Sequence, residues 1–265
     1  MTLDLFDRRA ILFLPASNPR AIAKARASRA EMVILDLEDA VKDEDKRAAR
    51  DAAVVAVGEA WPMPVGIRVN GVGTEWHGED VAALARSRAN FAVVPMVAFS
   101  AAVNSVREHS AKPVLAMIES AAGVLAAPAI AREAAGLIMG NNDLAADLRL
   151  PPGAGRGPLQ FALQSVILAA RAAGCAVFDG VFNRLDDPDG LAAECADARQ
   201  LGFDGKTLIH PNQIDPCRAA FAPAAEEISR AERLIAAASG GAERFEGAMV
   251  ETMHVDAAKR LLARR

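Results

Sequence analysis

The run PVLAMIES, residues 113–120, is an apolar stretch that closes on a carboxylate, Glu119. A short, continuous apolar run is typical of a strand that is buried on both faces. A charge beside such a strand costs several kcal/mol unless it has a partner. The fold that this run builds, and the partner that Glu119 finds in it, are therefore the two questions that the remaining sequence must answer.

Seven further apolar, β-branched runs are spread along the chain. They are ILFLP (11–15), MVILD (32–36), VGIRVN (65–70), FAVVP (91–95), GLIMG (136–140), CAVFDG (175–180) and GKTLIHP (205–211). Alanine-rich helical segments such as PLQFALQSVILAARAA (158–173) separate them. Strands that alternate with helices indicate parallel βαβ units. Eight units predict a TIM (β/α)8 barrel, although a doubly wound sheet has the same local pattern.

Polar side chains gather at the C-terminal ends of these runs, where the active site of a TIM barrel lies. The residues concerned are Asp36, Glu38, Asp39, Arg68, Asn70, Glu119, Asp143, Asp147, Asp179 and His210. Chance placement would scatter charges over both ends of the strands. We therefore expect this set to share one site.

Glu119 and Asp143 follow successive predicted strands, so they are expected to be neighbours at one rim of the barrel. Two adjacent carboxylates repel each other unless a cation or a shared proton lies between them. Oxygen ligands without a Cys or His pair at metal spacing favour Mg²⁺. The alternative is a salt bridge from Glu119 to an arginine, with Asp143 as the N-cap of the next helix.

Arg68 and His210 each have two interpretations. Arg68 lies inside a buried run. Its planar guanidinium either binds a substrate carboxylate or forms a structural ion pair with Asp36 or Glu38. His210 follows the last run and is either an acid/base group or a packed, hydrogen-bonded side chain.

Composition excludes several classes of protein. The 265 residues are 52% hydrophobic and carry a net charge of −4, which is no basic signature for nucleic acid. No apolar run is long enough to span a membrane. The first residues lack the layout of a signal peptide, and the three cysteines show no close pairing, as is usual in a reducing compartment. A cytoplasmic protein is expected.

Six motifs, read together, resemble one family. They are DLEDAV (36–41), IRVNG (67–71), IESAAG (118–123), NDLAADL (142–148), GFDGKTLIHPNQI (202–214) and FEGAMVE (245–251). The chain resembles the citrate lyase β-subunit-like CoA-ester lyases, whose relatives include malyl-CoA and citramalyl-CoA lyases. The resemblance covers nearly the whole chain, from about residue 11 to residue 251.

The resemblance implies a carbon–carbon lyase that uses Mg²⁺ to cleave or form a 3-hydroxyacyl-CoA such as malyl-CoA, citramalyl-CoA or citryl-CoA. The products of cleavage are an acyl-CoA and a 2-keto acid. It implies a catalytic TIM barrel over residues 1–221 and a helical extension over residues 222–265, which closes over a neighbouring subunit's site. It also implies a homotrimer or a hexamer.

The family's functional residues fall on positions of this chain. Its metal ligands match Glu119 and Asp143, and the residue that matches Glu119 also contacts the substrate. Its arginine for the substrate carboxylate matches Arg68. Its coenzyme A region begins at LPASNPRAIAK (14–24), which implies that Arg20 and Lys24 lie near the CoA phosphates. Basic side chains near a helix start suit phosphate on physical grounds as well.

Three positions depart from the family's pattern. The acid in the C-terminal motif is Glu251, where many relatives have Asp, and its implied role is proton transfer at a neighbouring subunit's site. Met96 stands where many relatives have Lys, and Asn142 where many have an acid. These departures leave the substrate open.

Three other functions remain open. One is a metal-dependent aldolase that joins pyruvate to a free aldehyde on the same barrel. The second is a thioesterase that hydrolyses malyl-CoA to malate and free CoA. The third is a non-catalytic, ligand-binding subunit, against which the complete set of Glu119, Asp143 and Arg68 argues.

Overall fold

The computed structural model describes residues 3–264. The chain divides into two compact units, Met1–Ala220 and Phe221–Arg265. None of the helices in the described part of the chain is long and apolar enough to cross a membrane.

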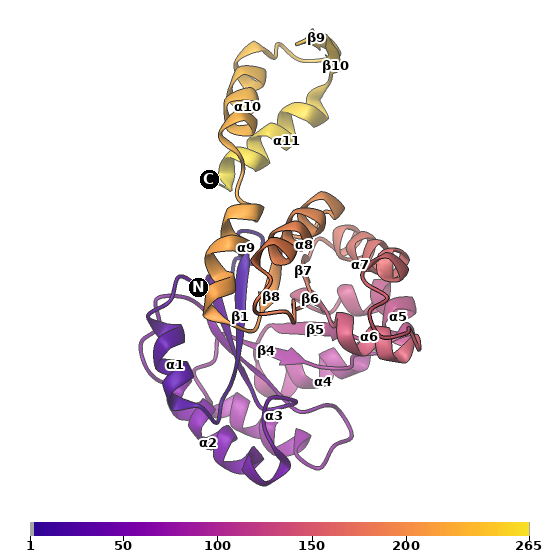
Figure 1. Ribbon diagram of the computed structural model, residues 1–265. Helices are drawn as coiled ribbons and strands as arrows, with labels where there is room; N and C mark the ends of the chain where they lie inside the picture. The colour runs from indigo at the N-terminus through magenta and orange to yellow at the C-terminus, as the bar shows by residue number, and fades with distance from the viewer. Residues whose placement is uncertain (1–2, 265) are drawn as a thin grey trace. The chain divides into compact units, whose positions relative to one another are not determined.

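The first unit is a closed barrel of parallel strands (Figure 1). Its strands are β1 (Ala10–Pro15), β2 (Met32–Asp36), β3 (Val65–Arg68), β4 (Phe91–Val94), β5 (Val114–Ile118), β6 (Gly136–Met139), β7 (Ala176–Asp179) and β8 (Gly205–Leu208). Each strand pairs with the next, and β8 returns to β1. The predicted TIM barrel is confirmed, and each of the eight predicted runs matches one strand, with β1 beginning one residue before its run.

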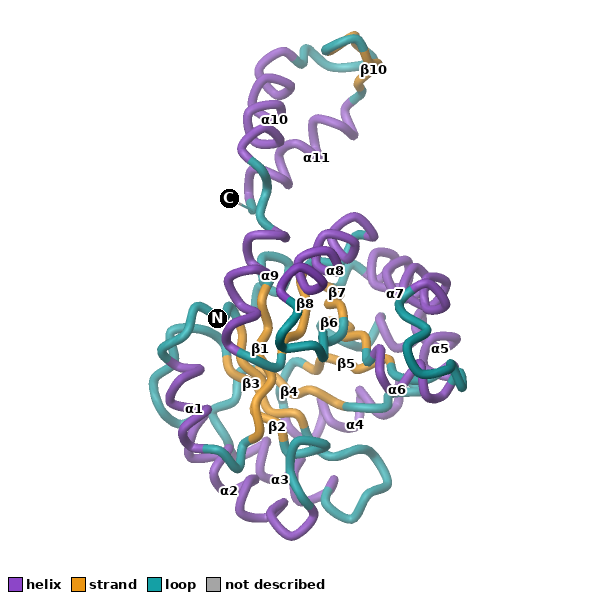
Figure 2. The backbone as a smooth tube through the Cα atoms, viewed as in Figure 1, coloured by secondary structure: helices purple, strands orange, loops and turns teal. Residues whose placement is uncertain are grey.

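Helices follow the strands around the outside of the barrel (Figure 2). They are α1 (Pro19–Arg26), α2 (Lys46–Val57), α3 (His77–Arg86), α4 (Ser100–Ser110), α5 (Ala121–Ala131), α6 (Asn141–Asp147), α7 (Gln160–Ala173), α8 (Pro188–Leu201) and α9 (Ile214–Phe221). Short 3-10 turns lie at Asp43–Asp45, Gly157–Leu159 and Pro211–Gln213.

Local sequence signals fix where these helices begin and end. The side chain of Asn18 caps α1 by accepting a hydrogen bond from the Ala21 N–H at 3.0 Å, and Pro19 opens the helix. Helices α7 and α8 end at Gly174 and Gly202, which have left-handed conformations that glycine adopts without a steric cost. The end of β1 thus lies close to the start of α1, and the ends of α7 and α8 lie close to the starts of β7 and β8.

The core inside the barrel is built from alternate residues of the strands. Its fully buried members include Ile11, Met32, Ile34, Phe91, Val93, Leu115, Ile138 and Phe178. Gly66 of β3 leaves the room that the Phe91 ring occupies, because a Cβ there would overlap that ring. This layer closes the barrel below the strand ends, so a ligand site is confined to the rim.

The second unit contains two helices and a hairpin. Helix α10 (Ala225–Ala237) and helix α11 (Thr252–Ala263) flank the antiparallel strands β9 (Glu243–Phe245) and β10 (Ala248–Val250). A small apolar cluster around Ala231, Leu234, Val250 and Ala258 holds it together. The expectation that residues 222–265 cover a neighbouring subunit's site stays a prediction.

Candidate active site

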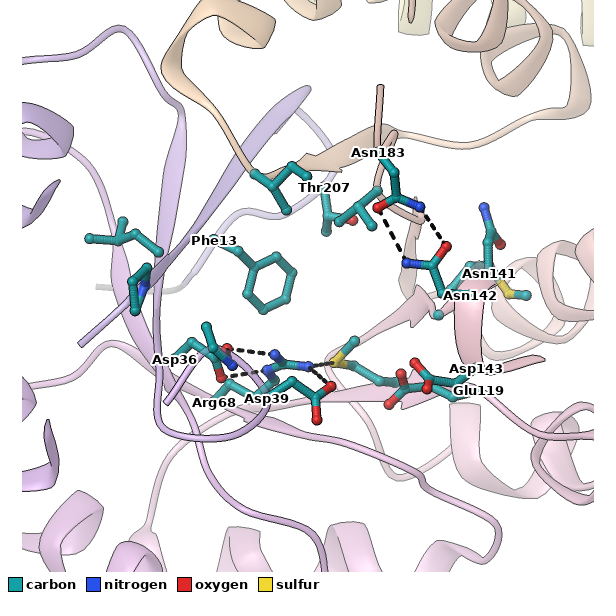
Figure 3. A pocket seen from close by; sticks show the side chains of 18 residues that line it. Phe13, Asp36, Asp39, Arg68, Glu119, Asn141, Asn142, Asp143, Asn183 and Thr207 are labelled. Atoms are coloured by element: carbon teal, nitrogen blue, oxygen red, sulfur yellow. Dashed lines mark hydrogen bonds and ion pairs between the residues drawn. The ribbon is translucent and has the colours of Figure 1, made fainter. Parts of the chain in front are cut away.

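A cavity of about 390 Å³ lies at the C-terminal ends of the strands (Figure 3). The polar side chains that line it are Asp36, Asp39, Arg68, Glu119, Asn141, Asn142, Asp143, Asn183 and Thr207. They come from six βα connections or strand ends, which is the usual place for the active site of this fold. The barrel thus brings together five of the charged residues that the sequence predicted to share a site.

Glu119 is buried at the end of β5, with 3% of its surface exposed. Its Oε1 accepts a hydrogen bond from the Met96 N–H at 2.8 Å. Gly140 makes room for it, because a Cβ at that position would overlap the Glu119 carboxylate. The pKa of Glu119 is raised to about 8, mainly by burial; the charges of Glu38 and Asp143 act in the same direction, whereas the Met96 N–H and Arg68 oppose the shift.

Asp143 lies in the first turn of α6, and its carboxylate is adjacent to that of Glu119 (Figure 3). The N-cap position belongs to Gly140, and no side chain caps the helix. The alternative interpretation of Asp143 as an N-cap is therefore wrong. Nor does Glu119 form an ion pair within residues 3–264, so the arginine alternative for its partner is not what the structure shows.

The pair of Glu119 and Asp143 suits a magnesium ion. Two carboxylates face one space, burial makes the charge on Glu119 unfavourable, and a divalent cation would remove that cost. In the described part of the chain, no group of three or more Asp, Glu, His or Cys side chains gathers to hold a metal. This fits Mg²⁺, which usually takes one or two carboxylates and completes its shell with water and substrate oxygens.

Arg68, the last residue of β3, is held by a set of carboxylates. Its Nε and Nη2 donate to the two oxygens of Asp36 at 2.7 and 2.6 Å, and Nη1 pairs with Glu38 at 2.6 Å. A third carboxylate, on Asp39, lies 3.8 Å from Nη1, and the Phe13 ring stacks on the guanidinium at 5.1 Å. Although burial opposes it, these carboxylates raise the pKa of Arg68 above its ordinary value. The structural partners that the sequence predicted for Arg68, Asp36 and Glu38, are thus present. The guanidinium also lines the cavity.

Asp179 does not line the cavity, so not every polar strand end joins the site; it belongs to a buried network that touches the lining through Asn141 Nδ2, at 3.3 Å. It is fully buried and accepts from Lys206 Nζ at 2.7 Å and Arg156 Nη1 at 3.0 Å. Lys206 also bonds to Glu194 of α8 at 2.6 Å. Burial alone would raise the pKa of Asp179, but the two cations outweigh it and lower that pKa. Sequence reasoning missed Lys206, although a lysine inside a buried run was a usable signal.

The remaining predicted strand-end residues have local roles. His210 Nδ1 accepts from the Asn212 N–H at 3.2 Å, which favours the packed interpretation over acid/base chemistry. Asn70 bonds to Asp80 at 2.7 Å. Asp147 accepts from the Ala121 N–H at 2.7 Å and so ties α6 to the start of α5, two residues after Glu119.

The residues that the family resemblance implied for coenzyme A and for proton transfer lie outside the cavity lining. Arg20 and Lys24 are exposed on α1, and Glu251 is exposed at the start of α11 in the second unit. Met96 has a left-handed backbone (φ 51°), which places its N–H on Glu119. The roles of Arg20, Lys24 and Glu251 stay predictions.

One pair of cavity residues was missed from sequence. Asn142 and Asn183 bond to each other through both amides, at 2.7 and 3.3 Å, across the connections that follow β6 and β7 (Figure 3). Neither residue carries charge, and the two are 41 positions apart. A signal for this pair is therefore absent from the local sequence.

Comparison with known proteins places this geometry in a family. The family model described as HpcH/HpaI aldolase/citrate lyase matches residues 9–211. A (3S)-malyl-CoA thioesterase of Cereibacter sphaeroides is 40% identical, over 97% of this chain and 94% of that protein. A citrate lyase subunit beta-like protein of Mycobacterium tuberculosis is 37% identical, over 96% and 94%.

Solved structures agree with the sequence relatives. CitE from Mycobacterium tuberculosis, in complex with magnesium, acetoacetate and coenzyme A, superposes with a TM-score of 0.87 at 34% identity, covering 98% of this chain and 99% of that chain. CitE in complex with magnesium and pyruvate superposes with a TM-score of 0.80 at 30% identity, over 98% and 100%. The resemblance predicted from six sequence motifs is confirmed. The chain belongs to the HpcH/HpaI aldolase/citrate lyase family.

Proposed function

We propose that this protein is a Mg²⁺-dependent carbon–carbon lyase that cleaves or forms a 3-hydroxyacyl-CoA of the malyl-CoA type. One observation carries the proposal: two adjacent carboxylates, Glu119 and Asp143, share a cavity with the Arg68 guanidinium. A cation site beside a fixed positive group suits a ligand that has a carboxylate next to a hydroxyl or keto oxygen. The 2-hydroxy-acid half of a 3-hydroxyacyl-CoA such as malyl-CoA has that pattern, and so does the 2-keto acid that this half becomes on cleavage.

Glu119 and Asp143 are the residues that would hold the metal. When bound, Mg²⁺ supplies Lewis-acid stabilisation of negative charge on a substrate oxygen. Glu119 is kept in position by the Met96 N–H and by the space over Gly140. Asp143 is kept in position by α6, which the Asp147–Ala121 hydrogen bond ties to the segment after Glu119.

Arg68 would bind and orient the substrate carboxylate through its face toward the cavity. It is pre-oriented because Asp36 holds two of its nitrogens in a fork. In cleavage the substrate hydroxyl loses its proton, the carbon–carbon bond breaks, and the acyl-CoA carbon gains a proton. Glu251 of a neighbouring copy is the proposed donor of the proton to the acyl-CoA carbon. In the reverse direction, Glu251 would remove that proton.

The relatives support the other parts of the proposal. CitE structures that contain coenzyme A and small keto acids overlap nearly the whole chain. Arg20 and Lys24 are exposed near the start of α1, where basic side chains can reach phosphates. Assembly as a homotrimer or hexamer, with residues 222–265 over a neighbour's site, belongs to the same proposal.

Hydrolysis of malyl-CoA is the second candidate function. Its support is the 40% identity to a (3S)-malyl-CoA thioesterase across almost the full length of both proteins. Both reactions need a site that binds the hydroxy acid half of the same CoA ester. They differ in the products, which are acetyl-CoA and glyoxylate for the lyase, and malate and free CoA for the thioesterase.

A product assay separates these functions. The purified protein is incubated with malyl-CoA and Mg²⁺, or with EDTA, and glyoxylate, free thiol and malate are measured separately. Glyoxylate without free thiol supports the lyase, and equal release of thiol and malate supports the thioesterase. Turnover that survives EDTA, or that is unchanged in Glu119→Gln, would contradict the metal assignment. A lack of both reactions, together with condensation of pyruvate with a free aldehyde, would favour the aldolase.

A further inference from the structure

Asp36 is a fixed partner of Arg68. Besides the two donors of the guanidinium, it accepts the backbone N–H groups of Glu38 at 2.9 Å and of Ala40 at 3.1 Å. Each of its carboxylate oxygens therefore accepts two hydrogen bonds. A buried carboxylate with four donors is costly to move, because every donor would be left without an acceptor.

Glu38 holds Arg68 in a different way. It meets the guanidinium through Nη1 alone. It also lines a second cavity, of about 510 Å³, together with Lys46 and Trp76. Asp39 lines this cavity and the active-site cavity, so the two adjoin at the turn after β2. The Glu38 side chain therefore has space beside it into which it can turn.

The charge balance around Arg68 is already negative. One guanidinium faces the carboxylates of Asp36, Glu38 and Asp39, and a substrate would bring a fourth. Nη1 also contacts Sδ of Met117, a residue of the active-site cavity lining, at 3.9 Å. A substrate carboxylate that binds Arg68 beside Met117 therefore meets the nitrogen that Glu38 occupies.

We propose that Glu38 is a specificity-determining residue, whose carboxylate competes with the substrate carboxylate for Nη1 of Arg68 and turns into the adjoining cavity when the substrate binds. The inference rests on the proposed function, because it requires Arg68 to receive the carboxylate of a keto acid. An anion that contacts Arg68 alone only replaces the ion pair with Glu38, so it gains little binding free energy. A 2-keto acid that also reaches the side of Glu119 and Asp143 has the additional contacts needed to displace it.

Binding of pyruvate in the presence of Mg²⁺, measured by isothermal titration calorimetry, tests this inference. We expect Glu38→Gln to bind pyruvate about tenfold more tightly, the scale on which one charge-assisted hydrogen bond acts. Glu38→Asp keeps the charge but shortens the side chain, so its affinity is expected to lie between those of the wild type and Glu38→Gln. Asp43→Asn, which removes an exposed charge that lines the second cavity but not the active-site cavity, is the matched control and should change affinity by less than about twofold.

Pyruvamide, the neutral analogue, distinguishes competition from a structural effect. Its binding should be unchanged by Glu38→Gln, because it has no carboxylate to compete with. Weaker or equal pyruvate binding in Glu38→Gln overturns the inference, as does an equal gain in Asp43→Asn, which would indicate general electrostatics. If the wild type does not bind pyruvate at all, the proposed function fails together with the inference; if it binds and Glu38→Gln changes nothing, the inference alone fails.

Discussion

Glu119 and Asp179 are both buried carboxylates at strand ends of one barrel, yet their surroundings are opposite. Asp179 has two cations, Lys206 and Arg156, within 3.0 Å, and its pKa is lowered. Glu119 has one backbone N–H and a neighbouring carboxylate, and burial raises its pKa to about 8. A compensated buried charge stabilises the fold, whereas an uncompensated one marks a place where a ligand is expected. On this difference we assign Asp179 a structural role and propose a functional one for Glu119.

The largest expected effect comes from removing the charge of Glu119. Glu119→Gln should lower Mg²⁺-dependent turnover of malyl-CoA by at least about a thousandfold, because a metal's stabilisation of the transition state amounts to several kcal/mol. Steady-state assays with saturating Mg²⁺ measure the turnover of malyl-CoA, and calorimetry should show loss of Mg²⁺ binding. Turnover within tenfold of the wild type would remove Glu119 from the metal site.

Breaking the compensated site should instead affect stability. Lys206→Met leaves Asp179 with one cation fewer inside the protein, and we expect a loss of about 3 to 5 kcal/mol in the free energy of unfolding. Urea denaturation measures it. Lys259→Met is the control, since Lys259 is 63% exposed and 3.9 Å from Asp256; its loss should stay below about 1 kcal/mol. Similar losses in both variants would contradict a structural role for the Asp179 network.

A smaller and more local effect is expected from Gly140→Ala. The added Cβ would overlap the Glu119 carboxylate, so the side chain must shift, and Mg²⁺ affinity should fall by roughly tenfold, as for misplaced ligand supports. Gly78→Ala is the matched control, because a Cβ at Gly78 meets no atom within 4 Å. Calorimetric titration of Mg²⁺ compares the two. An unchanged affinity in Gly140→Ala would show that the position of Glu119 is not critical.

The smallest expected effect is a slope of stability with pH. The pKa of Glu119 is raised from 4.5 to about 8 in the folded protein. Its contribution to the free energy of unfolding is therefore complete below about pH 4.5 and is lost as pH rises to 8. The lowered pKa of Asp179 acts in the opposite sense, and its contribution is lost only in acid. Metal-free protein should therefore become less stable between pH 5 and pH 8, by on the order of 1 kcal/mol or more. Denaturation at several pH values, with Glu119→Gln as a flatter reference, checks this; a steeper slope in that variant would refute it.

The barrel could be predicted from the sequence because its signals are local and repeated. Each strand is a short apolar run, and each is followed by a helical segment whose ends carry residues such as Asn18 and Gly174. The adjacency of Glu119 and Asp143 followed as well, because parallel strands that succeed one another place their C-terminal ends side by side.

The sequence by itself therefore determined the fold, the family and the two carboxylates proposed to hold magnesium. Only the tertiary structure decided which strand-end charges are compensated. Lys206 lies in the strand next to Asp179, but Arg156 reaches Asp179 from a distant loop. Arg68 is surrounded by the acid that ends β2 and by two acids of the turn that follows it. Compensation depends on distances between residues far apart in the chain and on burial, and neither is written in a local pattern.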